Sequence, residues 1–161
     1  MNDQTDLINL LQTIPWFQEL EPGIFDKIAG ICELTSFEAG QYLFREGDKE
    51  DYLYIVIEGR VAVEIHVPGR GKMRIYTAEA MDIIGWSSIT PVVRQRTAGA
   101  RAVLPSRLVR MQATALYKLC DEDHDLGYVV MRRLSNVVAS RLLTTRLQLL
   151  DMFAHPEVKE V

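Results

Sequence analysis

The chain has 161 residues, of which 48% are hydrophobic and 25% are charged, and its formal net charge is −4. This length fits one domain with a sizeable core. The negative charge argues against broad electrostatic binding of nucleic acid, although it leaves room for a local basic face. No apolar run reaches the roughly 18 residues of a membrane helix, and the amino terminus lacks the basic region of a signal peptide. We therefore expect a cytoplasmic protein with no membrane segment.

Two short helices are expected at the amino terminus, over residues 1–33. Residues 5–13 place three apolar side chains on one helical face, namely Leu7, Leu10 and Leu11. Pro15 ends this helix, and Pro22 is suited to the start of a second one. After Pro22, apolar residues recur at helical spacing: Ile24, Phe25, Ile28, Ala29 and Cys32.

Over residues 34–112 the pattern changes to short β-branched or aromatic runs separated by turn residues. Seven of the ten glycines lie between residues 40 and 99, so tight turns are concentrated there. The expected strands are Gln41–Arg45, Tyr52–Ile57, Arg60–Val67, Lys72–Ala78, Gly99–Leu104 and Arg107–Met111. Closely spaced strands of this kind suggest a small barrel or jelly roll.

Helical spacing returns over residues 113–153, and residues 154–161 are expected to form a tail. A short helix is predicted at 113–119, and acidic residues 121–123 then favour the start of a long helix. The apolar positions of the long helix repeat at near-heptad spacing: Met131, Leu134, Val138, Leu142, Leu149 and Met152. A helix of about thirty residues spans about 45 Å, which exceeds the width of a small barrel. We therefore expect a parallel homodimer through this helix; the alternative is that the seam packs on its own barrel.

The sequence GQYLFREGD at residues 40–48, followed by LYIVIEGRV at residues 53–61, resembles the cyclic-nucleotide-binding domain family. That family includes the catabolite activator, FNR-type regulators and the regulatory subunits of kinases. The resemblance covers roughly residues 14–153. It implies one mainly β domain over 1–161, a double-stranded β-helix (jelly-roll) β-roll with flanking helices and a long C-terminal dimerisation helix. It also implies a sensor or regulatory module that acts in signal transduction through an unknown protein partner and is not an enzyme.

The family's phosphate-binding cassette is a Gly-Glu pair on a short helix, followed at fixed spacing by Arg-Ser/Thr-Ala. The matching residues here are Gly85, Trp86, Ser87 and Ser88, and then Arg96, Thr97 and Ala98. The match implies that Gly85 allows close backbone approach and opens a short helix whose N–H groups favour an anion. It implies that Arg96 offers a fork of donors to a phosphate of cyclic AMP or cyclic GMP, with a hydroxyl from Thr97. The alternative for Arg96 is a solvated or ion-paired arginine at the end of a loop.

Trp86 departs from the family pattern, which has Glu here to accept a hydrogen bond from the ribose 2′-hydroxyl. Trp cannot accept that bond. Three interpretations remain open: Ser87 and Ser88 satisfy the ribose, Trp86 stacks on a different anionic ligand, or Trp86 fills a vestigial pocket. In the last case the protein would be a constitutive dimeric interaction module.

In the family the base contacts a hydroxyl residue of the long helix. Thr145 is the best match and Thr144 the next, and a polar position in the dimer seam is the alternative for Thr145. The chain ends about eight residues past the long helix, so we expect no helix-turn-helix and no DNA binding by this chain alone. The arginines of the long helix are expected to form a solvated or inter-subunit face: Arg132, Arg133, Arg141 and Arg146.

Small barrels also host metal-dependent oxygenases, whose sites need two or three histidines and a carboxylate that converge inside the barrel. His66, His124 and His155 are too dispersed for a metal-ligand set, and no P-loop, CxxC or Ser-His-Asp arrangement is present. We therefore expect no catalytic and no metal site. Cys32 and Cys120 are expected to be reduced, mostly buried thiols, with a redox role as the alternative.

Overall fold

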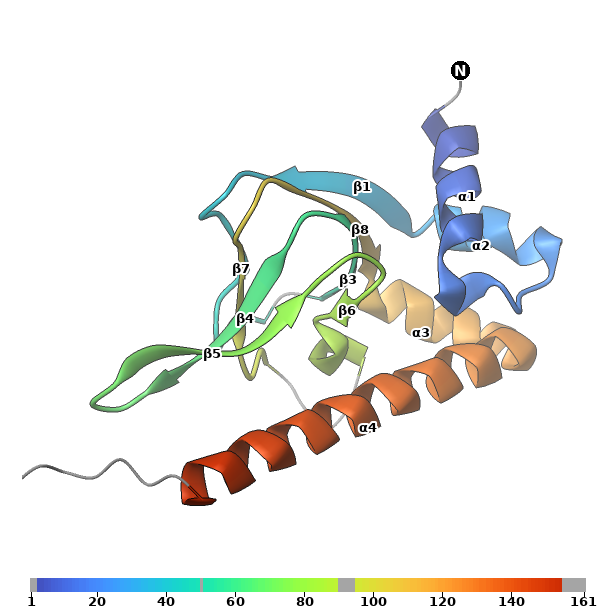
Figure 1. The fold of residues 1–161 in the computed structure, drawn as a ribbon. Coiled ribbons are helices and arrows are strands. Elements are labelled where there is room, and N and C mark those ends of the chain that lie inside the picture. The colour runs from blue at the N-terminus through green and yellow to red at the C-terminus, as the bar shows by residue number, and fades with distance from the viewer. Residues whose placement is uncertain (1–2, 50, 90–94, 155–161) are drawn as a thin grey trace, which may run out of the picture.

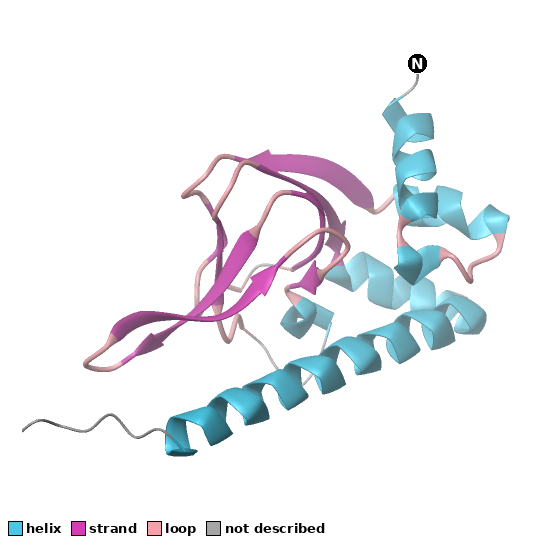
Figure 2. Cartoon of the chain, in the orientation of Figure 1, coloured by secondary structure: helices cyan, strands magenta, loops and turns pink. Residues whose placement is uncertain are grey.

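The computed structural model describes residues 3–49, 51–89 and 95–154 of the chain. Two antiparallel sheets form a roll, with short helices at its N-terminal end and one long helix along its side (Figure 1). Colouring by secondary structure separates the strands of the roll from the helices that flank it (Figure 2). The predicted fold class, a mainly β roll with flanking helices and a long C-terminal helix, is confirmed.

The N-terminal helices are α1 (Asp3–Thr13), the 3-10 turns η1 (Pro15–Phe17) and η2 (Pro22–Ile24), and α2 (Phe25–Ala29). The expected continuation of the second helix to Cys32 is wrong, because α2 ends after five residues. Cys32 instead begins a strand, and the Gln112 amide donates to the Ile31 carbonyl at 3.2 Å. The roll therefore starts two residues before the predicted boundary at residue 34.

The strands follow in the order β1 (Cys32–Phe37), β2 (Tyr42–Phe44), β3 (Tyr52–Glu58), β4 (Val61–Val67), β5 (Gly71–Ala78), β6 (Ile83–Ile84), β7 (Gly99–Ala102) and β8 (Ser106–Gln112). One sheet has the order β1-β8-β3-β6, and the other has the order β2-β7-β4-β5. The six predicted strands are present with small shifts at their ends. Strands β1 and β6 were not predicted.

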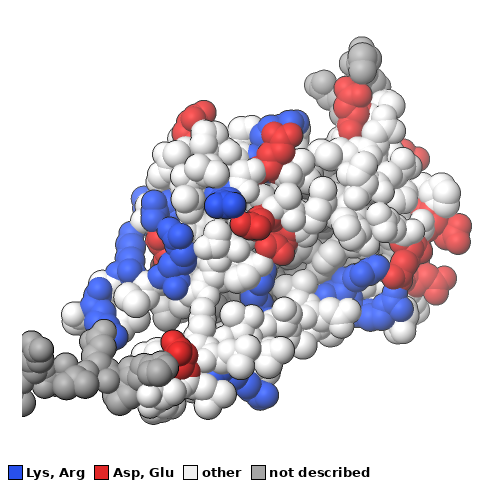
Figure 3. Space-filling view, in the orientation of Figure 1, with Lys and Arg blue, Asp and Glu red and all other residues white. Residues whose placement is uncertain are grey.

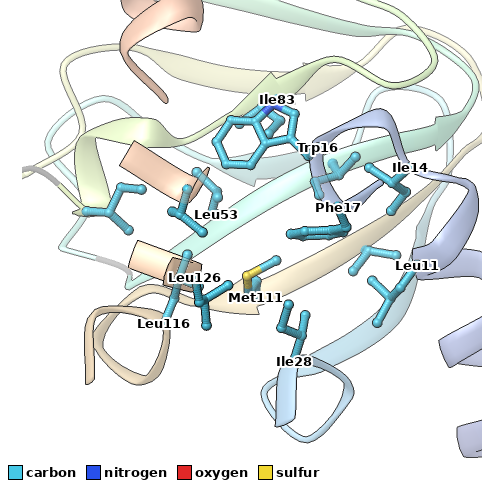
Figure 4. Close-up of a cluster of buried hydrophobic side chains, with 14 of the residues drawn as sticks. Leu11, Ile14, Trp16, Phe17, Ile28, Leu53, Ile83, Met111, Leu116 and Leu126 are labelled. Carbon is cyan, nitrogen blue, oxygen red and sulfur yellow. The ribbon is translucent and has the colours of Figure 1, made fainter. Parts of the chain in front are cut away.

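Strand β3 is buried on both faces, which explains its continuous apolar run. Successive side chains of a strand point to opposite faces. Leu53 and Ile55 join the cluster under the helices, which includes Phe17, Met111 and Leu126 (Figure 4). Tyr54 and Val56 of the same strand join the cluster inside the roll. This strand therefore links the two parts of the core.

Helix α3 (Ala113–Glu122) leads into α4 (His124–Ala154), which has 31 residues. The Asp123 carboxylate accepts a hydrogen bond from the Leu126 amide at 3.1 Å and so caps the start of α4. The early part of α4 packs on the core through Val130 and Leu134. Further along, the Gln148 side-chain amide donates to the Ile75 carbonyl of β5 at 3.0 Å, so α4 also contacts the roll.

Charge is spread unevenly over the surface. On the face drawn in Figure 3, basic side chains gather over the end of the β4–β5 hairpin and acidic ones around the N-terminal helices. Arg70, Lys72 and Arg74 of the hairpin are exposed. A local basic face thus exists in a chain of negative net charge.

Both cysteines are free thiols, and burial raises the pKa of Cys32 to about 12. Burial, with a contribution from Asp121 and Asp123, raises the pKa of Cys120 to about 11. At neutral pH both groups are therefore protonated and unreactive. In the described part of the chain, no helix combines the length and apolarity that crossing a membrane requires. Within the same residues, no three His, Cys, Asp or Glu side chains converge as a metal site.

Candidate functional site

The expected short helix after Gly85 is present as η3 (Trp86–Ile89), directly after β6. Gly85 has a φ of +79°, and a Cβ there would lie 2.7 Å from Arg96 Nη1 and 2.8 Å from the Tyr52 carbonyl oxygen. Only glycine fits this position without a shift of its neighbours. The close approach lets the loop lie directly against Tyr52 at the start of strand β3.

Arg96 is buried, with 2% of its surface exposed. Its guanidinium donates to the carbonyl oxygens of Gly85 at 2.8 Å and of Tyr52 at 2.5 Å. The guanidinium carbon also lies 4.1 Å from the centroid of the Phe44 ring. Two main-chain carbonyls thus take the guanidinium in this structure. A contact between Arg96 and a bound anion stays a prediction.

The Arg96 main chain connects the cassette to the turn at residues 46–48 of the motif. The Arg96 amide donates to the Asp48 carbonyl, and the Gly47 amide donates to the Arg96 carbonyl, both at 2.8 Å. Arg96 therefore contacts three segments at once: the turn at residues 46–48, the loop at Gly85 and strand β3. In this position it supports the cassette.

A cavity of about 160 Å³ lies between the cassette and α4. It is lined by seven of the nine predicted site residues: Gly85, Trp86, Ser87, Thr97, Ala98, Thr144 and Thr145. Ser88 and Arg96 do not line it. The other lining residues are Phe44, Val63, Ile75, Tyr76, Ile83, Ile84 and Arg141. The structure thus brings the two predicted halves of the site, the loop and the long helix, to one cavity.

The hydroxyl groups of the site differ in orientation. Ser87 lines the cavity, whereas the Ser88 hydroxyl donates to the Tyr52 carbonyl at 3.0 Å. The hydroxyls of Thr144 and Thr145 donate back to helix carbonyls, of Ser140 at 3.1 Å and of Arg141 at 2.9 Å. In this arrangement the two threonines present lone pairs, which accept hydrogen bonds, toward any guest.

Trp86 is half-buried and forms part of the cavity wall while also packing on the core cluster under the helices. The cavity stays open beside the indole. Trp86 therefore forms part of the cavity wall and at the same time supports the core. The stacking and the structural interpretations both remain compatible with this geometry.

Arg141 of α4 is a cavity residue that was not predicted. Its guanidinium carbon lies 3.1 Å from the centroid of the Tyr76 ring, and the Tyr76 hydroxyl donates to Asp82 at 2.5 Å. Burial and the bond to Asp82 raise the pKa of Tyr76, and Arg141 partly offsets this rise. The available signal was spacing, because Arg141 lies four residues before Thr145 and so shares its helix face.

The predicted solvated face of α4 arginines agrees with the exposed Arg132 and Arg146 but not with Arg133 and Arg141, which are half-buried. Arg133 donates to Glu19 at 2.5 Å, and Arg132 also pairs with Glu19, so both tie α4 to the N-terminal segment. Arg141 lies in the cavity wall. Arg146 is exposed, as expected.

A family model described as the cyclic nucleotide-binding domain matches residues 34–123. The chain is 27% identical over 136 residues to a CRP-like cAMP-activated global transcriptional regulator of Mycobacterium tuberculosis, covering 84% of this chain and 58% of that protein. It is 28% identical over 143 residues to the neuropathy target esterase sws of Drosophila grimshawi, covering 85% of this chain but 10% of that protein. The matched relatives are thus considerably longer than this chain.

Among solved structures, a putative cyclic nucleotide-binding protein from Geobacter metallireducens is similar, with 28% identity and a TM-score of 0.73. That match covers 83% of this chain and 96% of the other. The family match spans more than half of the sequence and agrees with the sheet order, the cassette and the long helix. The chain therefore belongs to the cyclic nucleotide-binding domain family and is a regulatory or sensor domain of that type.

Proposed function

We propose that the protein is a cytoplasmic, dimeric sensor that binds a small anionic ligand between the cassette and α4 and signals to a protein partner. Cyclic AMP and cyclic GMP are the first candidates, since the matched relatives include a cAMP-activated transcriptional regulator and a cGMP-dependent protein kinase. The observation that carries the proposal is that one cavity is lined both by residues of the cassette, including Gly85, Trp86 and Thr97, and by Thr144 and Thr145 of α4.

In this proposal the ligand acts by changing how α4 lies on the roll. A ligand shifts an equilibrium only by its difference in affinity for the two states. Because α4 supplies part of the wall, a guest contacts Thr144 or Thr145 in one position of the helix and loses that contact in another. The partner then responds to the position of α4. Arg96 supports the site by holding Gly85 and the loop in place.

The binding test uses calorimetry with cyclic AMP, cyclic GMP and other nucleotides, together with mass spectrometry of small molecules retained through purification. We expect saturable binding of one ligand per chain. We also expect Trp86→Glu to raise the affinity for cyclic AMP ten- to a hundredfold, since a carboxylate can accept a bond worth about 1.5–3 kcal/mol from the ribose hydroxyl.

The matched control is Trp86→Gln, which also removes the indole but offers a neutral amide of the same length. Its gain in affinity should be smaller than that of Trp86→Glu. Equal affinities in the two variants would contradict the ribose assignment. If no nucleotide binds and no small molecule is retained, the sensor proposal fails.

The second candidate is a constitutive dimeric interaction module with a vestigial pocket. The observation in its favour is the size of the cavity, about 160 Å³, because ligand pockets usually measure about 300–1,000 Å³. The binding test above separates the two candidates.

The dimer in this proposal forms through the C-terminal half of α4. This half exposes many large apolar side chains: Leu142, Leu143, Leu147, Leu149, Leu150, Met152 and Phe153. A monomer rarely exposes so much apolar surface on one element. A second copy of the same helix is the partner that the near-heptad spacing favours.

Replacing both Leu142 and Leu149 by Asp should convert the protein from a dimer to a monomer. These side chains are 50% and 51% exposed in the single chain and lie seven residues apart in the predicted seam, so both would enter the same interface. Burying four carboxylates per dimer should raise the dissociation constant by more than about a hundredfold. Sedimentation equilibrium measures the mass.

Leu104→Asp is the control, since Leu104 is 46% exposed but lies in the loop between β7 and β8. It should leave the dimer intact. A wild-type monomer at micromolar concentration, or a double variant that still dimerises, would rule out this interface.

A further inference from the structure

Arg141 is the charged side chain of the cavity wall. Among the described residues that line the cavity, no other carries a charge, and none is a carboxylate. Asp82 lies nearby, but its carboxylate accepts bonds from the Tyr76 hydroxyl and the Glu79 amide. The cavity therefore presents a net positive charge to a guest.

Arg141 also differs from its neighbours in its partners. Arg132 and Arg133 of the same helix pair with Glu19 of the N-terminal segment. In the described ranges, by contrast, no carboxylate lies within ion-pair distance of Arg141, whose guanidinium rests on the Tyr76 ring. A half-buried guanidinium without a counter-charge favours an anion, because screening by water is weaker there than at the open surface.

Arg96 does not compete for this role in the observed geometry. Its two terminal nitrogens donate to the carbonyls of Gly85 and Tyr52, and it does not line the cavity. A ligand anion that enters the cavity meets Arg141 without any rearrangement of the loop. To reach Arg96, the same anion would have to displace two main-chain acceptors.

The other residues that line the cavity indicate what kind of group the ligand carries besides its acidic group. Most of it is apolar or aromatic: Phe44, Val63, Ile75, Tyr76, Ile83, Ile84, Trp86 and Ala98. The threonine hydroxyls of α4 already donate to helix carbonyls. A volume of about 160 Å³ suits a guest of one or two fused rings rather than a large polar one.

We propose that Arg141 of α4, rather than Arg96 of the cassette, holds the acidic group of the ligand, and that the ligand is a small aromatic monoanion whose flat body lies against Trp86. This inference rests on the proposed function, since it assumes that the cavity is the sensor's ligand site. It places the recognition of the ligand's charge on α4 itself. Because Arg141 belongs to α4, its contact with the ligand's negative charge would couple ligand binding to the position of that helix.

The test compares 2-naphthoate with its neutral analogue 2-naphthamide on the full chain. Binding is followed by titration of the Trp86 indole N–H signal in heteronuclear NMR, assigned with Trp86→Phe. We expect the naphthoate to bind the wild type and Arg141→Gln to weaken this binding ten- to a hundredfold. The naphthamide should bind the wild type and Arg141→Gln equally.

Arg146→Gln is the matched control, because it removes the same charge from an exposed position of the same helix. It should leave naphthoate binding unchanged. Equal naphthoate affinity in the wild type and Arg141→Gln overturns the role of Arg141 but leaves the sensor proposal intact. Binding of cyclic AMP without binding of naphthoate overturns the ligand class. If neither binds, the proposed function fails along with this inference.

Discussion

Replacing Gly59 by Ala should lower the free energy of unfolding by about 2–5 kcal/mol. Gly59 has a φ of +95°, a conformation that costs a residue with a Cβ about 1–2 kcal/mol. The new Cβ would also lie 2.5 Å from the Pro105 carbonyl oxygen and 2.7 Å from the Ser106 Cα. These are backbone atoms, so the turn itself has to move, and overpacking of this kind adds about 1–3 kcal/mol. Urea unfolding followed by circular dichroism measures the change.

Substitutions at two other glycines distinguish the cost of the positive φ from the cost of the steric clash at the new Cβ. Gly69 has a φ of +78° with no atom within 4 Å of a built Cβ, so Gly69→Ala should cost only about 1–2 kcal/mol. Gly23 has neither feature, and Gly23→Ala should be neutral or stabilising by up to about 1 kcal/mol. If Gly59→Ala were as mild as Gly69→Ala, the close packing of the β3–β4 turn on Ser106 would be incorrect.

Of the eight strands in the described residues, the sequence predicted six and missed β1 and β6. Strand β1 carries exposed Glu33 and Leu34 and shows no clear alternation, so only its pairing with β8 defines it as a strand. Cys32 happened to continue the helical spacing of α2, although that helix has only five residues. Strand β6 has two residues, which is too short for any period to appear.

The candidate site was predictable to the extent that it follows the motif. The spacing of the cassette and the hydroxyl positions of the long helix identified seven residues that line one cavity. The sequence did not predict that Arg96 supports the loop, because one of its acceptors is the main-chain carbonyl of Tyr52, 44 residues away. Arg141 shares the helix face of Thr145, but its contact with the Tyr76 ring depends on tertiary packing, which the sequence alone does not show.

Arg96→Ala should lower the free energy of unfolding by about 2–4 kcal/mol. The substitution removes two charge-assisted hydrogen bonds, to Gly85 and Tyr52, and the contact with the Phe44 ring. It also leaves a void next to the cassette, which adds the cost of a cavity. The cost of burying a guanidinium offsets part of the loss, so the expected value is below the sum of these contributions. Chemical unfolding is the measurement.

Two further substitutions make this result informative about function. Arg96→Lys keeps the charge but loses the planar fork, so its stability should fall between those of Arg96→Ala and the wild type. Arg74→Ala, at an exposed position of β5, should change stability by less than about 0.5 kcal/mol. If Arg96→Ala were as stable as the wild type, the guanidinium would not brace the loop. It would then be available to a ligand, and the assignment of the anion to Arg141 would lose its main structural argument.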